Sequence, residues 1–254
     1  MDALFNPAAI YGLMLVFFRA GGLLALAPAF SAQAVPVIIR VALAFLLSML
    51  INSLVPLPHE TPGHFLLFVL AIGHELVIGL LMGLAVRFVF YALEMAAQIM
   101  ATEIGLIVTT TLDPISHAES SPLAVAISNL GIIIFFASGA HHLMIMAFVR
   151  SFELVPAAAG NFDPHVVELV VKESGRIFLL AVQMAAPLIA INFLVHLTLA
   201  ILSRAAPVVN AFVLSIPIQI FAGLSVFGMV AGLTAYYVLG ALGGVPELML
   251  RFIH

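Results

Sequence analysis

Residues 205–246 read AAPVVNAFVLSIPIQIFAGLSVFGMVAGLTAYYVLGALGGVP and contain no Asp, Glu, Lys or Arg. A helix that crosses a hydrocarbon core of about 30 Å needs roughly 20 mainly apolar residues. The run is about twice as long as one such span. It therefore predicts apolar helices that either tilt strongly and break, or bury part of their surface against other protein rather than lipid.

The rest of the chain shares this apolar character. Of its 254 residues, 64% are hydrophobic and 8% are charged, whereas a soluble domain is about 45–50% apolar and about 25% charged. This composition excludes a water-soluble globule and predicts an integral membrane or membrane-complex protein. The net charge of −4, with 8 Lys and Arg, argues against nucleic acid as a partner. The lack of cysteine excludes disulfides, thiolate nucleophiles and Cys-ligated metals.

Proline, glycine and polar residues divide the chain into six apolar blocks. Backbone groups in lipid must bond within their own segment, and no block alternates apolar with polar residues, so each block predicts helix rather than strand. We expect an all-α fold of about six long helices, tilted or broken because several exceed one span. The blocks are Ala8–Phe30, Val37–Leu57, Phe65–Leu93, Pro122–Val149, Ile177–Ser203 and Ala211–Leu242.

The cations near the ends of the blocks favour neither membrane orientation. For six spans, one face would hold Arg40, Arg87 and Arg204, and the other Arg150, Lys172, Arg176 and Arg251. Three against four is no bias, so the positive-inside rule assigns no topology. Charge counting leaves open both a charge-poor permease and a chain that is buried in a larger membrane complex.

No motif indicates an enzyme, a cofactor or a metal site. Residues 73–78 read GHELVI and begin like a zinc-protease helix, but Ile78 stands where the second histidine must be. His141 and His142 are adjacent, so on a helix they would point about 100° apart, which is poor for sharing one ion. The sequence also lacks a Gly-x-Ser-x-Gly elbow and a phosphate loop. We expect a protein without catalytic residues, bound metal or cofactor.

Small residues recur at intervals of four in two blocks, and this spacing lets a second helix approach closely. We therefore favour helix packing over a role in lining a pore. The spacing leaves open whether the packing helix belongs to this chain or to another. The residues are Gly79 and Gly83 in the third block, and Gly228, Gly232, Gly240 and Gly244 in the last.

Charged residues inside the apolar blocks would be costly if they faced lipid, so each should meet a partner or a wet cavity. A proton relay usually needs an ordered series of carboxylates through the span. No such series is present, and we favour structural pairing. Arg87 and Glu94 lie two helical turns apart with Tyr91 between them. The predicted buried charges are Arg19, Glu75, Arg87, Glu94 and Arg204.

The segment Gly105–Pro122 differs from every block. It begins too apolar for a solvated linker, yet its polar residues and prolines do not suit a continuous transmembrane helix. Irregular backbone at membrane depth is tolerated only where protein covers it or water lines it. We therefore predict a loop folded inward, as a gate or plug. Its candidate residues are Gly105, Thr109, Thr110, Thr111, Asp113, Pro114, Ser120 and Pro122.

Taken in order along the chain, several groups of residues resemble the FliR family of flagellar export-gate proteins and their injectisome counterparts. Gln219 departs from the pattern, because lysine often stands there, and Ala97, Ala200 and Val208 depart as well. The resemblance rests on Arg19, Pro28, Phe30, Pro36 and Arg40, then Glu94–Gln98 and Gly105–Pro114, then His141–His142, Ser151–Phe152 and Pro156, and finally Ser203–Pro207, Asn210, Phe212 and Pro217.

The resemblance implies a core subunit of the type III protein export channel at the bacterial inner membrane, in the basal body of the flagellum. Such a subunit lines and plugs the pore through which unfolded export substrates pass. It assembles with the FliP and FliQ proteins into a hetero-oligomeric channel, with FlhB at the cytoplasmic side, and also contacts membrane lipid.

The same resemblance implies a FliP-like first part and a FliQ-like C-terminal helix hairpin. We expect one export-gate subunit over residues 1–254, with N-terminal helices in 1–104, a plug loop in 105–122, a middle helix and polar connection in 123–176, and the hairpin in 177–254. Alternatives that remain are the injectisome counterpart of the same gate, a small-solute secondary transporter, and a purely structural subunit with an inert loop. A transporter would predict inverted repeats, and we find no internal repeat.

Overall fold

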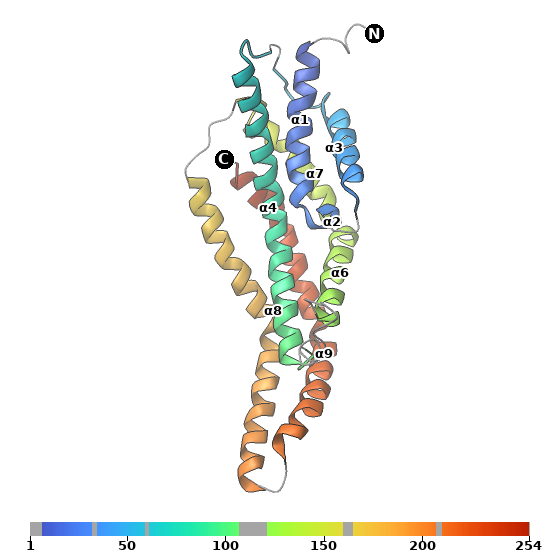
Figure 1. Cartoon of the computed structure of the whole chain (residues 1–254), viewed down its shortest axis with the longest axis vertical. Coiled ribbons are helices and arrows are strands. Elements are labelled where there is room, and N and C mark those ends of the chain that lie inside the picture. The colour runs from blue at the N-terminus through green and yellow to red at the C-terminus, as the bar shows by residue number, and fades with distance from the viewer. Residues whose placement is uncertain are drawn as a thin grey trace. The chain divides into compact units, whose positions relative to one another are not determined.

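The computed structural model describes residues 7–31, 35–58, 61–106, 121–159, 165–206 and 210–253. Within these ranges every regular element is a helix, which confirms the all-α fold class (Figure 1). The helices are α1 (Pro7–Leu26), α2 (Pro28–Ser31), α3 (Val37–Ile51), α4 (Phe65–Glu103), α6 (Pro122–Ala137), α7 (Ala140–Leu154), α8 (His165–Ala205) and α9 (Ala211–Arg251).

The helix ends differ from the predicted blocks in several places: α1 and α3 end earlier than their blocks, at Leu26 and Ile51, and α9 continues to Arg251. α4 continues past Leu93 to Glu103, because the polar residues there lie on a helix whose other face stays apolar. α8 begins at His165, so that part of the polar connection belongs to the same helix as the fifth block. The fourth block is broken into α6 and α7, which meet at a bend of 65°. Gly139 adopts a left-handed φ of 74° at this bend, a conformation that glycine accepts readily.

Four helices of the described chain are long and apolar enough to cross a membrane, which confirms the predicted membrane class. They are Pro7–Leu26, Phe65–Glu103, His165–Ala205 and Val213–Arg251, and the bent pair α6–α7 passes the same test together. The second block yields only the 15-residue helix α3, which is too short for a full span. Six apolar blocks thus give at most five candidate spans among the described residues.

The chain divides into two compact units. The first comprises Met1–Val89, Phe135–Ser174 and Ala241–His254. In it α1 lies beside α3 (Figure 1), and its core is built from large side chains that are almost fully buried. Phe148 and Phe152 meet edge to face, with their ring centroids 5.4 Å apart. Other core residues are Leu15, Leu23, Met82 and Phe252.

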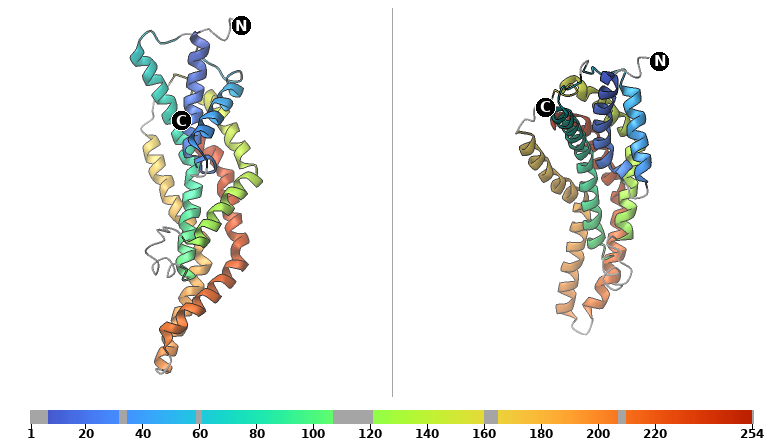
Figure 2. Two further views of the ribbon diagram at one scale, coloured as in Figure 1. Left: turned by 45° about the vertical axis from the view of Figure 1, so that its right-hand side comes forward. Right: turned by 45° about the horizontal axis from the view of Figure 1, so that its top comes forward.

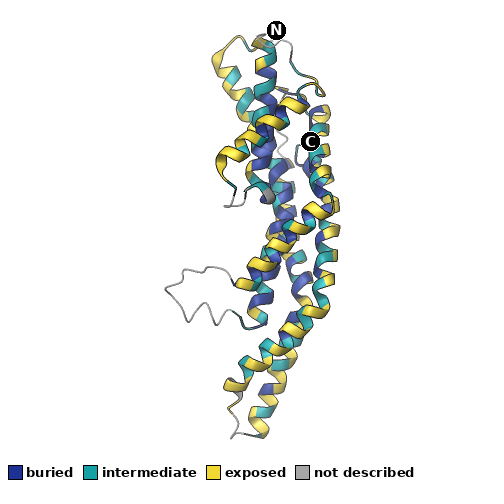
Figure 3. Cartoon of the chain, turned by 90° about the vertical axis from the view of Figure 1, so that its right-hand side faces the viewer, coloured by how far each residue is buried: buried dark blue, intermediate teal, exposed yellow. Residues whose placement is uncertain are grey.

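The second unit comprises Phe90–Ile134 and Gly175–Gly240. Its parts of α8 and α9 run antiparallel as a hairpin in both views of Figure 2. Met100, Ile104 and Leu188 are fully buried in this unit. The hairpin arms carry many exposed positions (Figure 3). Large apolar side chains lie among them, including Phe221, which is 77% exposed, and Met229, which is 83% exposed. Such a surface is typical of a protein that is covered by lipid or by other subunits.

Candidate functional site

A buried ion pair joins α1 to α4 in the first unit. Nε of Arg19 donates a hydrogen bond of 2.5 Å to Oε2 of Glu75, and both side chains are fully buried. The structure therefore gives each of these two predicted buried charges the other as its partner. Removing one partner of a buried ion pair destabilises a protein by about 3–5 kcal/mol, because the other charge stays buried without a counter-ion. The pair thus fixes how α1 and α4 meet.

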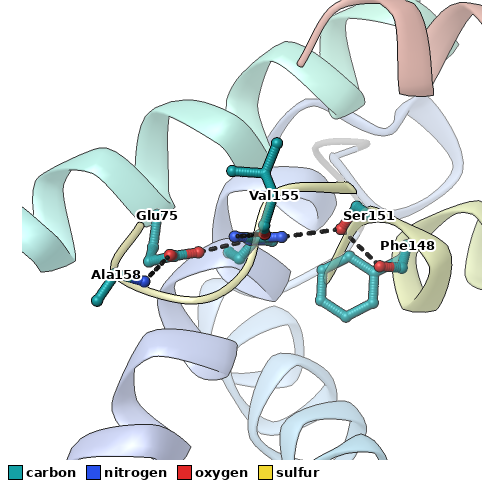
Figure 4. A network of polar contacts seen from close by, with 6 residues as sticks. Glu75, Phe148, Ser151, Val155 and Ala158 are labelled. Carbon is teal, nitrogen blue, oxygen red and sulfur yellow. Dashed lines mark hydrogen bonds and ion pairs between the residues drawn. The ribbon is translucent and has the colours of Figure 1, made fainter. Parts of the chain in front are cut away.

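The remaining contacts of Arg19 reach α7 and the chain that follows it. Nη1 donates to Oγ of Ser151 at 3.0 Å, and Nη2 donates to the carbonyl of Val155 at 3.0 Å. The guanidinium also lies 3.9 Å from the centre of the Phe152 ring, a cation–π contact. The hydroxyl of Ser151, which accepts from Arg19, in turn donates a hydrogen bond of 2.6 Å to the carbonyl of Phe148 (Figure 4).

The second carboxylate oxygen of Glu75 holds the turn after α7. Oε1 accepts a hydrogen bond of 3.0 Å from the backbone N–H of Ala158 (Figure 4). Ala158 has a φ of 65°, which L-residues with a Cβ rarely adopt. Glu75 and Arg19 together therefore tie α1, α4, α7 and a strained turn into one polar cluster, which we call the Arg19–Glu75 cluster. The cluster has a structural role, because both charged side chains form hydrogen bonds with other groups of the same chain.

Glycines allow the close helix approach that brings this pair together. A Cβ on Gly79 would overlap the carbonyl oxygen of Arg19, and one on Gly83 would lie 2.7 Å from the carbonyl oxygen of Leu23. On α1, a Cβ on Gly22 would lie 2.5 Å from the carbonyl oxygen of Leu76. These are backbone contacts, which no side-chain rotation can relieve. The partner helix of Gly79 and Gly83 is thus α1 of the same chain.

The glycine row of α9 differs from the packed glycines of α1 and α4, because no other helix among the described residues packs against it. A Cβ added at any of its four glycines would meet no atom of the described residues within 4 Å beyond the local backbone. The four glycines are exposed, and Tyr236, which lies among them at the same interval, is 71% exposed. The row consists of Gly228, Gly232, Tyr236, Gly240 and Gly244, and we call it the α9 glycine face.

The other predicted buried charges are less enclosed than Arg19 and Glu75. Arg87 and Glu94 are half-buried on α4, and each has an interacting partner. Arg204 is exposed, so its predicted burial is wrong for the chain itself. It lies in the last turn of α8, where the helix dipole favours a cation.

Of the predicted plug segment, only the two ends lie among the described residues. Gly105 terminates α4 with a φ of 83°. The N–H of Leu106 bonds to the carbonyl of Ala101 at 3.0 Å, and the N–H of Gly105 to that of Thr102 at 2.9 Å, which is the Schellman pattern of a glycine C-cap. Thr109, Thr110, Thr111, Asp113, Pro114 and Ser120 lie outside the described residues.

The far end of the segment is equally well defined. Pro122 is the first residue of α6, a position that suits its fixed φ and missing N–H. Oγ of the buried Ser121 accepts a hydrogen bond of 3.4 Å from the N–H of Ala124 and so caps the helix. Both ends of the segment are therefore fixed by local backbone geometry within the second unit.

The described residues contain no group of three or more His, Asp or Glu placed to hold a metal ion. The rings of His141 and His142 are in contact at a tilt of 38°, with their centroids 3.9 Å apart, and His141 lies beside the Phe135 and Phe136 rings. The two imidazoles thus form part of an aromatic cluster at the start of α7.

Sequence reasoning missed several residues of the Arg19–Glu75 cluster. Ser151, Val155 and Ala158 lie more than one hundred positions from Arg19 along the chain, so no local spacing connects them. Ser151 enters the sequence-based predictions only through the family resemblance. Gly22 was also missed, because only the packing of α1 on α4 distinguishes it from its neighbour Gly21, which meets nothing within 4 Å.

The sequence of this chain is similar to those of several known bacterial proteins. A family model described as "Bacterial export proteins, family 1" matches residues 10–244. The flagellar biosynthetic protein FliR of Caulobacter vibrioides is 28% identical over 234 residues, which cover 90% of this chain and 92% of that protein. FliR of Bacillus subtilis is 29% identical over 82% of this chain and 81% of its own. Yop proteins translocation protein T of Yersinia pestis is 35% identical over 59% of this chain and 58% of its own.

The residues matched by the family model include the Arg19–Glu75 cluster, the segment 105–122 and most of the α8–α9 hairpin. The family model alone covers well over half of the sequence. The chain therefore belongs to the FliR family of bacterial export proteins, and it is also similar to Yop proteins translocation protein T of Yersinia pestis.

Proposed function

We propose that this component of the type III export apparatus lines the pore of a flagellar protein export channel in the bacterial inner membrane, and plugs it with residues 105–122. The match of nearly the whole chain to flagellar export proteins carries the proposal. The apolar spans support a place in the membrane. The two firmly terminated helices at Gly105 and Pro122 support a segment that starts and ends at fixed points.

The mechanism that fits is conduction rather than catalysis. An unfolded substrate would thread through the pore while another part of the apparatus supplies the driving force. A segment with small polar residues can seal against ions when the channel is idle and yield to diverse side chains when it opens. The chain itself contributes the wall and the seal, and we propose no enzymatic step for it.

The partners we propose are the FliP and FliQ proteins, which would form the channel with this chain, and FlhB at the cytoplasmic side. The α9 glycine face supports such an assembly, because small residues at this interval allow close helix contact. Nothing among the described residues occupies that face. A partner helix would cover it and the large apolar side chains nearby.

An injectisome gate is the second candidate, favoured by the 35% identity to translocation protein T of Yersinia pestis. Purification of the tagged, full-length chain from its native membranes tests both. We expect a stable complex that contains FliP and FliQ proteins if the chain serves a flagellum, and their injectisome counterparts otherwise. A chain that purifies as a monomer, with full solute-uptake activity of its own, would instead support the transporter alternative.

A further inference from the structure

We propose that two side-chain pairs, Glu103–Asn192 and Gln219–His196, anchor the C-terminal end of α4 to α8 and α9, and so position the point from which the following segment leaves the helix. All four residues belong to the second unit. The consequence for the closed channel rests on the proposed function. The anchor itself can be tested independently of that function.

The end of α4 packs tightly on α9. A Cβ on Gly223 would lie 2.8 Å from Cγ1 and 3.2 Å from Cβ of Ile104, so glycine at this position leaves room for the isoleucine side chain. Ile104 is fully buried. One turn earlier on α9, Oε1 of Gln219 lies 3.2 Å from the position of a Cβ on Gly105. The last residues of α4 thus lie directly against α9.

A polar contact holds the same end of α4 to α8. Nδ2 of Asn192 donates a hydrogen bond of 2.5 Å to Oε2 of Glu103. Glu103 is the last residue of α4, where the helix dipole disfavours a carboxylate. Asn192 lies in the apolar stretch Ile191–Val195 of α8, where an amide without a partner would be costly. Neither residue suits its own helix, and the bond gives a partner to the Asn192 amide nitrogen and to the Glu103 carboxylate, while Oδ1 of Asn192 stays buried without a hydrogen bond to the described residues.

The second pair links the two arms of the hairpin at the level of Gly105. Nε2 of Gln219 lies 2.8 Å from Nε2 of His196, within hydrogen-bond distance. The amide of Gln219 therefore uses its nitrogen on α8 while its oxygen faces Gly105 on α4. Because its nitrogen bonds His196 and its oxygen lies beside the open side of Gly105, the Gln219 side chain lies where α4, α8 and α9 meet.

The backbone geometry of Gly105 links the anchored end of α4 to the segment that follows it. Its left-handed φ of 83° and the Schellman hydrogen bonds fix the direction in which Leu106 leaves α4. Since Ile104 and Glu103 are held by α9 and α8, that direction is fixed relative to the hairpin and not only to α4. We therefore assign Asn192 and Gln219 as positioning residues for the start of the segment.

A cross-linking experiment tests the anchor directly, because the chain contains no cysteine. Disulfides need a Cβ–Cβ distance of about 3.5–4.5 Å, and an Ile104→Cys and Gly223→Cys pair comes within a few tenths of an ångström of this range. In the assembled complex we expect rapid disulfide formation under a mild oxidant. Asn192→Leu or Gln219→Leu should slow it by about threefold to tenfold, the equivalent of one lost hydrogen bond. An unchanged rate in both variants would overturn the proposal.

Matched controls separate the anchor from general damage. The hydroxyls of Thr198 and Ser225 bond to carbonyls of their own helices, at 2.8 Å and 2.7 Å. Thr198→Ala and Ser225→Ala should therefore leave the cross-linking rate unchanged. If these controls slow it as much as Asn192→Leu does, the effect is general loosening of the hairpin and the positioning role is wrong.

Ion conductance of the same complexes tests the consequence. We expect Asn192→Leu and Gln219→Leu to raise the leak of the closed channel. Oxidation of the Ile104→Cys and Gly223→Cys pair to a disulfide should reverse that leak. A leak that persists after cross-linking would overturn the positioning role. If the anchor variants slow cross-linking but deletion of residues 107–120 causes no leak, the anchor stands and the plug function fails.

Discussion

Oε2 of Glu75 accepts a hydrogen bond of 2.5 Å from Nε of Arg19, although the two residues lie 56 positions apart and neither side chain is exposed. The bond closes the cluster that joins α1, α4 and α7. Two ions inside an apolar core are stable only when each satisfies the other and the remaining donors find acceptors. The loss of either partner should therefore destabilise the first unit.

Glu75→Gln keeps the shape of the side chain but removes its charge, leaving the Arg19 guanidinium buried without a counter-ion. We expect the protein to lose about 3–5 kcal/mol of stability, measured as a lower thermal midpoint of the purified complex. Glu153→Gln, at an exposed position on α7, is the control and should change nothing. The double variant Arg19→Met with Glu75→Leu should be more stable than Glu75→Gln. An unaltered midpoint for Glu75→Gln would contradict a structural role for the pair.

Gly79→Ala should be severely destabilising, because the added methyl group overlaps the backbone of α1 at Arg19. α1 and α4 would have to separate, which would also stretch the bond between Arg19 and Glu75. Gly73→Ala on the same helix meets nothing within 4 Å. It should be neutral or stabilise by up to about 1 kcal/mol through helix propensity. Protease resistance of the two variants in detergent measures the difference, and equal resistance would refute the close packing.

Ala158→Gly should stabilise the first unit. Ala158 holds a φ of 65°, a conformation that costs L-residues roughly 1–2 kcal/mol and glycine almost nothing. Part of the gain is offset by the greater freedom of glycine in the unfolded chain. The hydrogen bond from its N–H to Glu75 is kept in this variant. A rise in the thermal midpoint is the expected result, and a clear fall would mean that the turn is not strained.

The α9 glycine face should tolerate larger side chains in the isolated chain but not in the complex. Gly232→Leu and Gly240→Leu add bulk where nothing among the described residues lies within 4 Å. We expect unchanged helix content by circular dichroism and a loss of co-purifying partner subunits. Gly175→Leu, at an exposed glycine of α8, is the matched control and should retain its partners. Full retention of partners by the Gly232 and Gly240 variants would show that no partner helix packs there.

Apolar length and composition predicted the fold class, because only helices satisfy backbone groups in so apolar a chain. They did not predict the break at Gly139, since the apolar run continues through it and only the glycine marks the bend. Nor did apolar composition predict that the third block continues through polar residues to Glu103, where the glycine C-cap at Gly105 ends the helix.

In the candidate site, too, the sequence predicted the kind of contact but not the partner that makes it. Gly79 and Gly232 have the same spacing pattern, yet Gly79 packs on α1 and Gly232 meets open space among the described residues. Spacing reports that a helix can be approached closely and carries no information on which helix approaches it. Likewise the cost of a buried charge predicted that Arg19 and Glu75 need partners. That each is the other's partner follows only from how α1 and α4 pack in three dimensions.

Ion conductance of the purified native complex in a planar bilayer tests most directly whether residues 105–122 of this chain close an export pore. The comparison is between the complete chain and a variant lacking residues 107–120, in which Gly105 and Pro122 keep their helix ends. With subunit composition unchanged, we predict a silent complex for the complete chain and a steady ion leak for the shortened one. Two equally silent complexes would contradict the account.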